Sequence, residues 1–228
     1  LGDPDGLARA GDLEDFAVGF SLTEGIVAEA GAITSIEVVA LAAGIEMRMW
    51  LAAGHGVTLA ERRRRIAGPT GCGLCGVESL AEALRPVVPV GPGIRVVAGD
   101  LMQAMESLAP LQALNHETRA VHAAAFWRPG DGILLVREDV GRHNALDKLV
   151  GALARGGIDG ARGVLLLTSR VSVEMVQKAA SAGIAIVAAV SVPTALAVST
   201  AEEAGMTLVA VARRDGFEIF TRPDRIVE

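Results

Sequence analysis

Four short, unbroken runs of apolar residues in the second half of the chain limit its fold more than any other feature. Strands that are covered on both faces of a sheet read as continuous apolar runs, and amphipathic segments lie between these four. Strand, helix and strand in repetition predict an α/β fold with a mostly parallel sheet and right-handed crossovers. A further short run, at residues 217–220, predicts a last strand at an edge. The four runs are residues 133–136, 164–167, 184–190 and 207–211, and the amphipathic segments are residues 145–154, 173–182 and 195–204.

The N-terminal part of the chain predicts one helix and one hairpin. Apolar residues, Phe16 among them, recur at helical spacing after Asp12, which is a suitable N-cap. Apolar and polar residues then alternate on either side of residues 42–44. This alternation predicts an antiparallel pair of strands at residues 33–41 and 45–51.

A change in composition predicts two domains. Proline and glycine are densest at residues 86–93, and such stretches are typical of domain boundaries. We expect a smaller N-terminal α+β domain, residues 1–98, and a larger C-terminal domain, residues 99–228. The larger domain would open on a helix that Asp100 can cap and that Pro110 interrupts.

The composition excludes several classes of protein. Hydrophobic residues make up 51% of the chain and aromatic residues 3%, so the core must be built from alanine, valine, leucine and isoleucine, as is common in α/β proteins. The formal net charge of -6 argues against a general nucleic-acid binder, which needs a basic face. The sequence pattern predicts neither a secretory leader nor a membrane-spanning segment. We therefore expect a cytoplasmic protein that binds neither nucleic acid nor membranes.

Both cysteines of the chain lie in one glycine-rich stretch. Cys72 and Cys75 belong to the loop at residues 68–76, which lies shortly after four arginines at residues 62–65 and directly before a helical pattern at residues 77–84. Positive charge and a helix N-terminus both lower the pKa of a thiol, and the thiolate is the reactive form. The pattern therefore favours sulfur chemistry.

Four explanations of the Cys-x-x-Cys motif stay open on the residues alone. A zinc knuckle needs four ligands, and the histidines of the chain are not spaced as a second pair. A thioredoxin-like redox pair is compatible with the helix, although four glycines make a looser loop. Two buried structural cysteines fit poorly beside four arginines. A thiolate that carries sulfur fits best.

Polar clusters follow the apolar runs, where ligands bind in an open α/β sheet. Each cluster opens a helix, so backbone N–H groups, hydroxyls and the cations Arg142 and Arg170 would converge on a crevice suited to phosphate. The alternative is that Asn144, Ser172 and Thr194 are ordinary N-caps and the arginines are solvated. Three clusters in register favour a ligand site. Its candidate residues are Glu138, Asp139, Gly141, Arg142, His143, Asn144, Thr168, Ser169, Arg170, Ser191 and Thr194.

Three residues of this crevice have competing roles. His143, beside Asp139 and Asp147, is a candidate general base, a neutral group that positions a ligand, or a structural residue at the helix start. Glu138 and Asp139 are candidates for accepting paired hydrogen bonds from the N–H groups of a guanine.

With both regions in view, the sequence closely resembles the FdhD/NarQ family, the formate dehydrogenase accessory sulfurtransferases. The string from Asp139 to Lys148, Asp-Val-Gly-Arg-His-Asn-Ala-Leu-Asp-Lys, is highly specific, whereas Cys-x-x-Cys alone is not. The matching segments span nearly the whole chain. They are residues 12–25, 72–76, 138–148, 168–170 and 191–194.

The resemblance implies a sulfurtransferase that accepts persulfide sulfur from a cysteine desulfurase. It would pass the sulfur to a bis-molybdopterin guanine dinucleotide cofactor of molybdenum, which formate dehydrogenase needs. The family further implies a homodimer, a cytidine-deaminase-like α/β/α fold for the larger domain, and no metal of the protein's own. By position, Cys72 and Cys75 would be the catalytic thiols, with Cys72 the likelier persulfide carrier. The crevice would hold the guanine nucleotide ends, for which GDP is a fragment.

The sequence departs from the family pattern at two places. Gly71 replaces the usual serine before the first cysteine, and Arg119-Ala120 replaces a usual Gly-Gly. A zinc deaminase is disfavoured, because such enzymes need His-x-Glu and a downstream Pro-Cys-x-x-Cys, and His122 is followed by two alanines. A non-catalytic cofactor chaperone and a zinc-bridged dimer stay open as alternatives.

Overall fold

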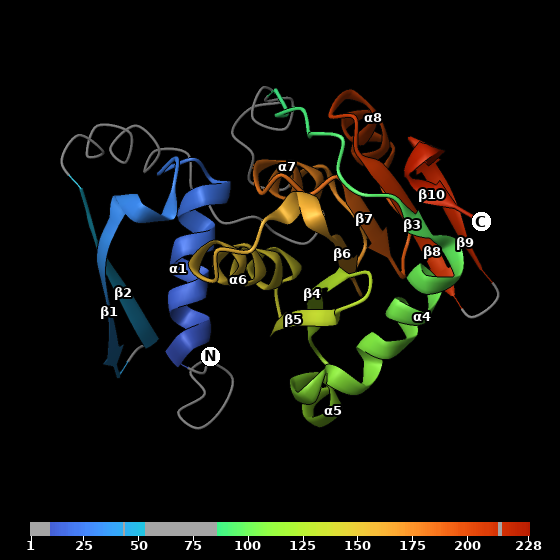
Figure 1. Ribbon diagram of the computed structural model, residues 1–228. Coiled ribbons are helices and arrows are strands. Elements are labelled where there is room, and N and C mark those ends of the chain that lie inside the picture. The colour runs from blue at the N-terminus through green and yellow to red at the C-terminus, as the bar shows by residue number, and fades with distance from the viewer. Residues whose placement is uncertain (1–9, 43, 53–85, 214–215) are drawn as a thin grey trace.

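A six-stranded sheet lies at the centre of the protein, in a computed structural model that describes residues 10–42, 44–52, 86–213 and 216–228 (Figure 1). The strands are β4 (His122–Arg128), β5 (Gly132–Asp139), β6 (Val164–Leu167), β7 (Ile186–Ala189), β8 (Thr207–Arg213) and β9 (Gly216–Thr221). Their order is β5-β4-β6-β7-β8-β9. β5, β6, β7 and β8 point in one direction, whereas β4 and β9 are antiparallel to their neighbours. The mostly parallel sheet is as predicted, and β9 lies at an edge as expected.

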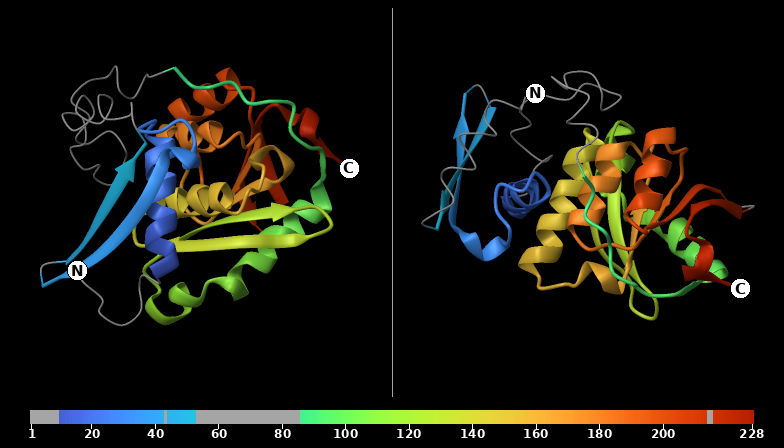
Figure 2. Two further views of the ribbon diagram at one scale, coloured as in Figure 1. Left: turned by 60° about the vertical axis from the view of Figure 1, so that its left-hand side comes forward. Right: turned by 90° about the horizontal axis from the view of Figure 1, so that it is seen from above.

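Helices cover both faces of this sheet. α6 (Arg142–Arg155), α7 (Val173–Ser181) and α8 (Ala195–Glu203) pack on one face, and α4 (Ala98–Leu108) packs on the other (Figure 2). Strand side chains alternate between the two cores, with Leu165 facing α6 and α7 and Leu166 facing α4. Burial on both faces explains why these strands are continuous apolar runs.

β4 is the one strand of the central sheet that the sequence analysis missed. It forms a hairpin with β5 through a turn in which Gly130 and Gly132 have positive φ, and it also pairs with β6. Three successive alanines have low strand propensity, and burial on both faces removes any alternation of polar and apolar residues. The crossover from β5 to β6 therefore passes over β4, which lies between them.

The N-terminal elements form a further layer outside α6. α1 (Ala10–Thr23) packs along α6, and the predicted hairpin, β1 (Ile33–Leu41) with β2 (Gly44–Leu51), is confirmed. A short 3-10 turn, η1 (Ala30–Ala32), leads into β1, and a small apolar cluster around Ile26 joins the hairpin to α1. Figure 2 shows the succession of hairpin, α1, α6 and sheet in its right-hand view.

The segment before α4 follows the surface of the larger unit. Val90 donates its N–H to the carbonyl of Ala204 (2.9 Å), and the buried Arg225 donates from Nε to the carbonyl of Pro92 (2.7 Å). β3 (Val96–Val97) then pairs with β10 (Ile226–Val227). The division at residues 98 and 99 stays a prediction. The remaining elements are α5 (Ala113–Thr118) and the 3-10 turns η2 (Ala109–Leu111), η3 (Gly160–Arg162) and η4 (Pro223–Arg225).

Neither predicted aspartate cap is an N-cap. Asp12 and Asp100 both lie within the first turn of their helices, and the residue at the N-cap position of α4 is Val97, whose side chain makes no capping bond. Carboxylates are also favoured inside the first turn by the helix dipole, so the same sequence signal fits either position.

Candidate functional site

The carboxyl ends of β5, β6 and β7 meet at one edge of the sheet, where α6, α7 and α8 begin. The amino end of β4 lies at the same edge, because β4 runs antiparallel to β5 and β6, and His122 lies opposite Asp139. The structure therefore brings together all the predicted crevice residues and adds a histidine that was not among them. We call this set the strand-end edge: His122, Glu138, Asp139, Gly141, Arg142, His143, Asn144, Thr168, Ser169, Arg170, Ser191 and Thr194.

Asp139 holds the loop between β5 and α6 in place. One carboxylate oxygen accepts from the N–H of Gly141 (2.8 Å) and from the side-chain amide of Asn144 (3.1 Å), and the other pairs with Lys148 (2.7 Å). Lys148 is buried and also donates to the carbonyl of Glu138 (3.0 Å). Asn144 is the third residue of α6, whose N-cap is Gly141, so Asn144 braces the loop and is not a cap.

Glu138 reaches away from this loop and anchors α5. Its two carboxylate oxygens accept hydrogen bonds from the backbone N–H groups of Leu114 (2.8 Å) and Asn115 (2.9 Å). These bonds satisfy donors at the helix start that would otherwise lack partners. The carboxylate already receives the paired hydrogen bonds that a guanine was predicted to supply, and its role toward a ligand stays a prediction.

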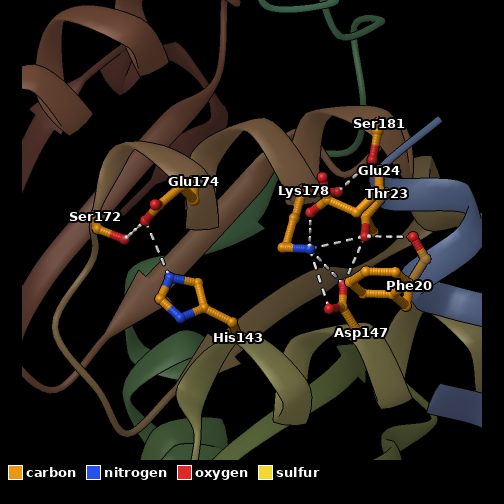
Figure 3. Close-up of polar contacts among 9 residues, drawn as sticks. All are labelled: Phe20, Thr23, Glu24, His143, Asp147, Ser172, Glu174, Lys178 and Ser181. Carbon is orange, nitrogen blue, oxygen red and sulfur yellow. Dashed lines mark hydrogen bonds and ion pairs between the residues drawn. The ribbon is translucent and has the colours of Figure 1, made fainter. Parts of the chain in front are cut away.

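His143 pairs with a carboxylate that the sequence analysis did not name. Its Nε2 lies 3.1 Å from Glu174 on α7, which also accepts from the hydroxyl of Ser172 (3.0 Å), as Figure 3 shows. Burial favours protonation of Glu174, yet hydrogen bonding and charge from His143, the Ser172 hydroxyl and the charge of Arg142 outweigh burial and lower the pKa of this carboxyl. Asp139 and Asp147, the partners expected for His143, bind lysines instead.

The loops after β6 and β7 lie side by side. Val171 donates to the carbonyl of Val192 (3.3 Å), and Thr194 donates to the carbonyl of Val171 (2.9 Å). Thr194 is a true N-cap, because its hydroxyl accepts from the N–H of Ala197 (3.1 Å). Ser172 stands at the N-cap position of α7 without making a capping bond.

The hydroxyls of these two loops serve mainly local contacts. Thr168 accepts from the N–H of Ala123 on β4 (2.8 Å), and the buried Ser169 donates to the carbonyl of Arg170 (3.0 Å). The backbone carbonyl of Ser191 accepts from Val211 (3.4 Å), a β-branched residue with φ 54° at the bulge in β8. Thr168 and Ser169 therefore position the backbone of the edge.

Positive charge gathers at the strand-end edge. Arg142 begins α6 and Arg170 follows β6 at the edge where His122 begins β4. Burial lowers the pKa of His122, and the charges of Arg142 and Arg170 lower it further. The Nε of Arg142 is buried and has no hydrogen-bond partner among the described residues. A buried donor without a partner is costly, and an anion bound here would satisfy it.

A buried network next to the His143–Glu174 pair ties α1 to the larger unit. Lys178 on α7 bonds both carboxylate oxygens of Asp147 (2.9 and 3.0 Å), the hydroxyl of Thr23 (2.9 Å) and Glu24 (2.7 Å) (Figure 3). Thr23 in turn donates to Asp147 (2.6 Å). Burial raises the pKa of Asp147, against the pull of Lys178 and Thr23. His143 and Asp147 lie four residues apart on α6, and Glu174 and Lys178 lie four residues apart on α7, so each helix presents both of its polar groups on one face.

The predicted catalytic residues Cys72 and Cys75, and the arginines at residues 62–65, lie outside the described residues. Within the described ranges, no group of three or more histidine, aspartate or glutamate side chains could hold a metal ion. In the same ranges, no helix is long and apolar enough to cross a membrane.

A cavity of about 260 Å³ lies elsewhere, between α1 and the hairpin. Four of its lining residues are apolar, and the ion-paired Glu14 and Arg155 also line it. No residue of the strand-end edge lines it. The strand-end edge is therefore argued from charge and position, and not from a cavity.

A protein of known structure shares this α/β architecture. The crystal structure is that of a protein from Desulfotalea psychrophila that is assigned as a formate dehydrogenase accessory protein. It superposes on this chain with a TM-score of 0.71 at 25% sequence identity, and the match covers 95% of this chain and 80% of that one. The sequence matches the model of the FdhD/NarQ family over residues 7–227. The chain belongs to the FdhD/NarQ family.

Curated relatives agree with this assignment. The protein named sulfur carrier protein FdhD from Agrobacterium fabrum is 52% identical over 223 residues, which cover 97% of this chain and 82% of the relative. The protein of the same name from Brucella abortus is also 52% identical, with 97% and 83% covered. The resemblance stated from the motifs is confirmed. The cytidine-deaminase-like description of the larger unit stays a prediction.

Proposed function

We propose that this chain is a sulfur carrier that serves the maturation of formate dehydrogenase. The observation that carries the proposal is its 52% identity, over nearly its whole length, to proteins named sulfur carrier protein FdhD, together with the Cys72-x-x-Cys75 motif inside the matched region. As a sulfurtransferase it would accept sulfur from a cysteine desulfurase and deliver it to the bis-molybdopterin guanine dinucleotide cofactor of molybdenum. Homodimer formation and a cytoplasmic location belong to the same proposal.

The sulfur transfer is a thiolate exchange. The Cys72 thiolate attacks the outer sulfur of the desulfurase persulfide, so a new S–S bond forms on Cys72 as the desulfurase cysteine leaves as a thiolate. No external oxidant is needed. Arginines at residues 62–65 would stabilise the attacking thiolate and the persulfide anion.

The strand-end edge would hold the nucleotide ends of the cofactor as substrate. Arg142 supplies a cation from the start of α6 and Arg170 supplies one from the loop after β6. The unpartnered Nε of Arg142 gives a phosphate oxygen a buried donor. The N–H groups at the start of the 14-residue helix α6 add a favourable dipole.

Persulfide loading tests the sulfur-carrier role. After incubation with a cysteine desulfurase and cysteine, mass spectrometry of the wild-type protein is expected to show one added sulfur on Cys72. Cys72→Ala should lose this sulfur and fail to support active formate dehydrogenase, whereas Cys75→Ala should still accept it. A chaperone that only shields the cofactor predicts the opposite, namely that Cys72→Ala still supports the enzyme and that neither cysteine gains mass.

Nucleotide binding tests the strand-end edge. Arg142→Gln is expected to weaken GDP binding, measured by calorimetry, by about 10- to 100-fold, because it removes a charged hydrogen bond to phosphate. Arg162→Gln is the matched control, since Arg162 is an exposed arginine before the opposite end of β6. Equal affinities of the two variants would remove Arg142 from the binding site.

A further inference from the structure

We propose that His122 is a third anion contact at the strand-end edge and takes up one proton when a phosphate-bearing ligand binds beside Arg142 and Arg170. The inference rests on the proposed function, because it concerns the same ligand. It adds a residue and a proton-coupled binding step that the proposed function does not contain.

The position of His122 follows from the alternation of β4. Ala124 and Phe126 belong to the core under α6 and α7, so His122, two residues before Ala124, faces the same side at the end of the strand. Arg142 is the first residue of α6, on that side of the sheet, and Arg170 follows β6, the strand next to β4. The imidazole is half-buried at the point where three chain segments meet.

The carboxylates of Asp139 and Glu174, on the elements around the strand-end edge, are already engaged. Asp139, opposite His122 on β5, pairs with Lys148, and Glu174 on α7 is bound by His143 and Ser172. His143 faces Glu174 from α6. The charges that act on His122 are therefore those of Arg142 and Arg170, and these charges and burial both hold its pKa below the usual value.

A bound phosphate would reverse this balance. Its negative charge neutralises the two guanidinium groups and stabilises an imidazolium, which donates from a ring nitrogen to a phosphate oxygen; the proton comes from solvent. Because the pKa of His122 would be higher in the complex than in the free protein, binding should be strongest at low pH. The gain is lost as pH rises through the pKa of the complex.

Calorimetry with GDP across pH 6 to pH 8 tests this coupling. Measuring the enthalpy in buffers of different ionisation enthalpy counts the protons taken up. GDP itself titrates in this range, so the readout is the difference between wild type and His122→Gln. We expect the wild type to take up more protons, and the variant to bind about 10-fold more weakly at pH 6 and within about 2-fold at pH 8. His116→Gln, at an exposed histidine of α5, is the matched control and should follow the wild type.

Two outcomes separate this inference from the proposed function. Equal proton uptake, with an affinity ratio that does not change with pH, would overturn the role of His122 and leave nucleotide binding intact. No GDP binding by the wild type at any pH would overturn both. An NMR titration of the wild type guards against misfolding of the variant: GDP should raise the pKa of the His122 ring, and an unchanged value would also overturn the inference.

Discussion

Gly19→Ala is expected to lower the free energy of unfolding by about 3 kcal/mol, because α1 and α6 touch backbone to backbone at this point. A Cβ on Gly19 would lie 1.7 Å from the carbonyl oxygen of Asp147, and one on Gly151 would lie 1.8 Å from the carbonyl oxygen of Asp15. Backbone atoms cannot move aside as a flexible side chain does. The added methyl must therefore push the two helices apart.

The separation would also strain the ion pairs that join α1 to β5 and α6. The buried carboxylate of Asp15 accepts hydrogen bonds from the guanidinium groups of Arg137 on β5 (2.6 Å) and Arg155 on α6 (2.6 Å). These short contacts need the close approach of the helices. Urea unfolding followed by circular dichroism measures the loss, which corresponds to a midpoint temperature lower by roughly 6–12 °C.

Gly99→Ala is the matched control for this substitution. Gly99 lies in the first turn of α4, and nothing is found within 4 Å of the position of its Cβ. Alanine reduces the conformational freedom of the unfolded chain, so this variant should be as stable as the wild type or slightly more stable. If Gly19→Ala unfolds at the same urea concentration as Gly99→Ala, α1 and α6 do not touch backbone to backbone at Gly19.

The strands and the site were predictable to different extents. Runs such as residues 164–167 are buried on both faces, so their continuous apolar composition predicts a strand. Ligands bind beyond the carboxyl ends of such strands, and this rule placed Arg142 and Arg170 at one edge. β4 has neither high strand propensity nor an alternation of polar and apolar residues. His122 was missed as a site residue because its strand was missed. The error in one element therefore became an error in the site.

Contacts between helices could not be predicted from the sequence, for a different reason. Gly19 and Gly151 are far apart in the chain, and nothing in either local sequence says that two helices meet there. The Asp147–Lys178 pair likewise joins residues from two helices, and its partner Thr23 comes from a third. Local pattern gives the face of a helix, but the partner of that face follows only from the packed structure.

Lys178→Met is expected to have the largest effect on stability, about 3–5 kcal/mol at neutral pH, because it leaves the buried Asp147 without its counter-charge. Asp147 is 1% exposed and Lys178 4% exposed, so water cannot replace the lost partner without opening the interface. Thr23 would still donate one hydrogen bond to Asp147. Glu24, whose side chain is 27% exposed, can turn toward solvent.

The loss should depend on pH in a direction that follows from Asp147. Burial already raises the pKa of Asp147 above its value in the unfolded chain, and removal of Lys178 raises it further. A raised pKa means that the folded state binds the proton more tightly, so stability is greatest below the unfolded pKa and falls as pH rises through the folded pKa. The difference between Lys178→Met and the wild type should therefore be smaller at pH 5 than at pH 8.

Lys148→Met is the control that distinguishes the loss of the counter-charge of Asp147 from the loss of a buried lysine in general. Lys148 is as buried as Lys178, but its partner Asp139 has a side chain that is 21% exposed and keeps two hydrogen bonds, from Gly141 and Asn144. Its loss should cost less and depend less on pH. Urea unfolding of the two variants at pH 5 and pH 8 makes the comparison. If both variants lose the same free energy at both pH values, Asp147 is not the buried charge that Lys178 neutralises.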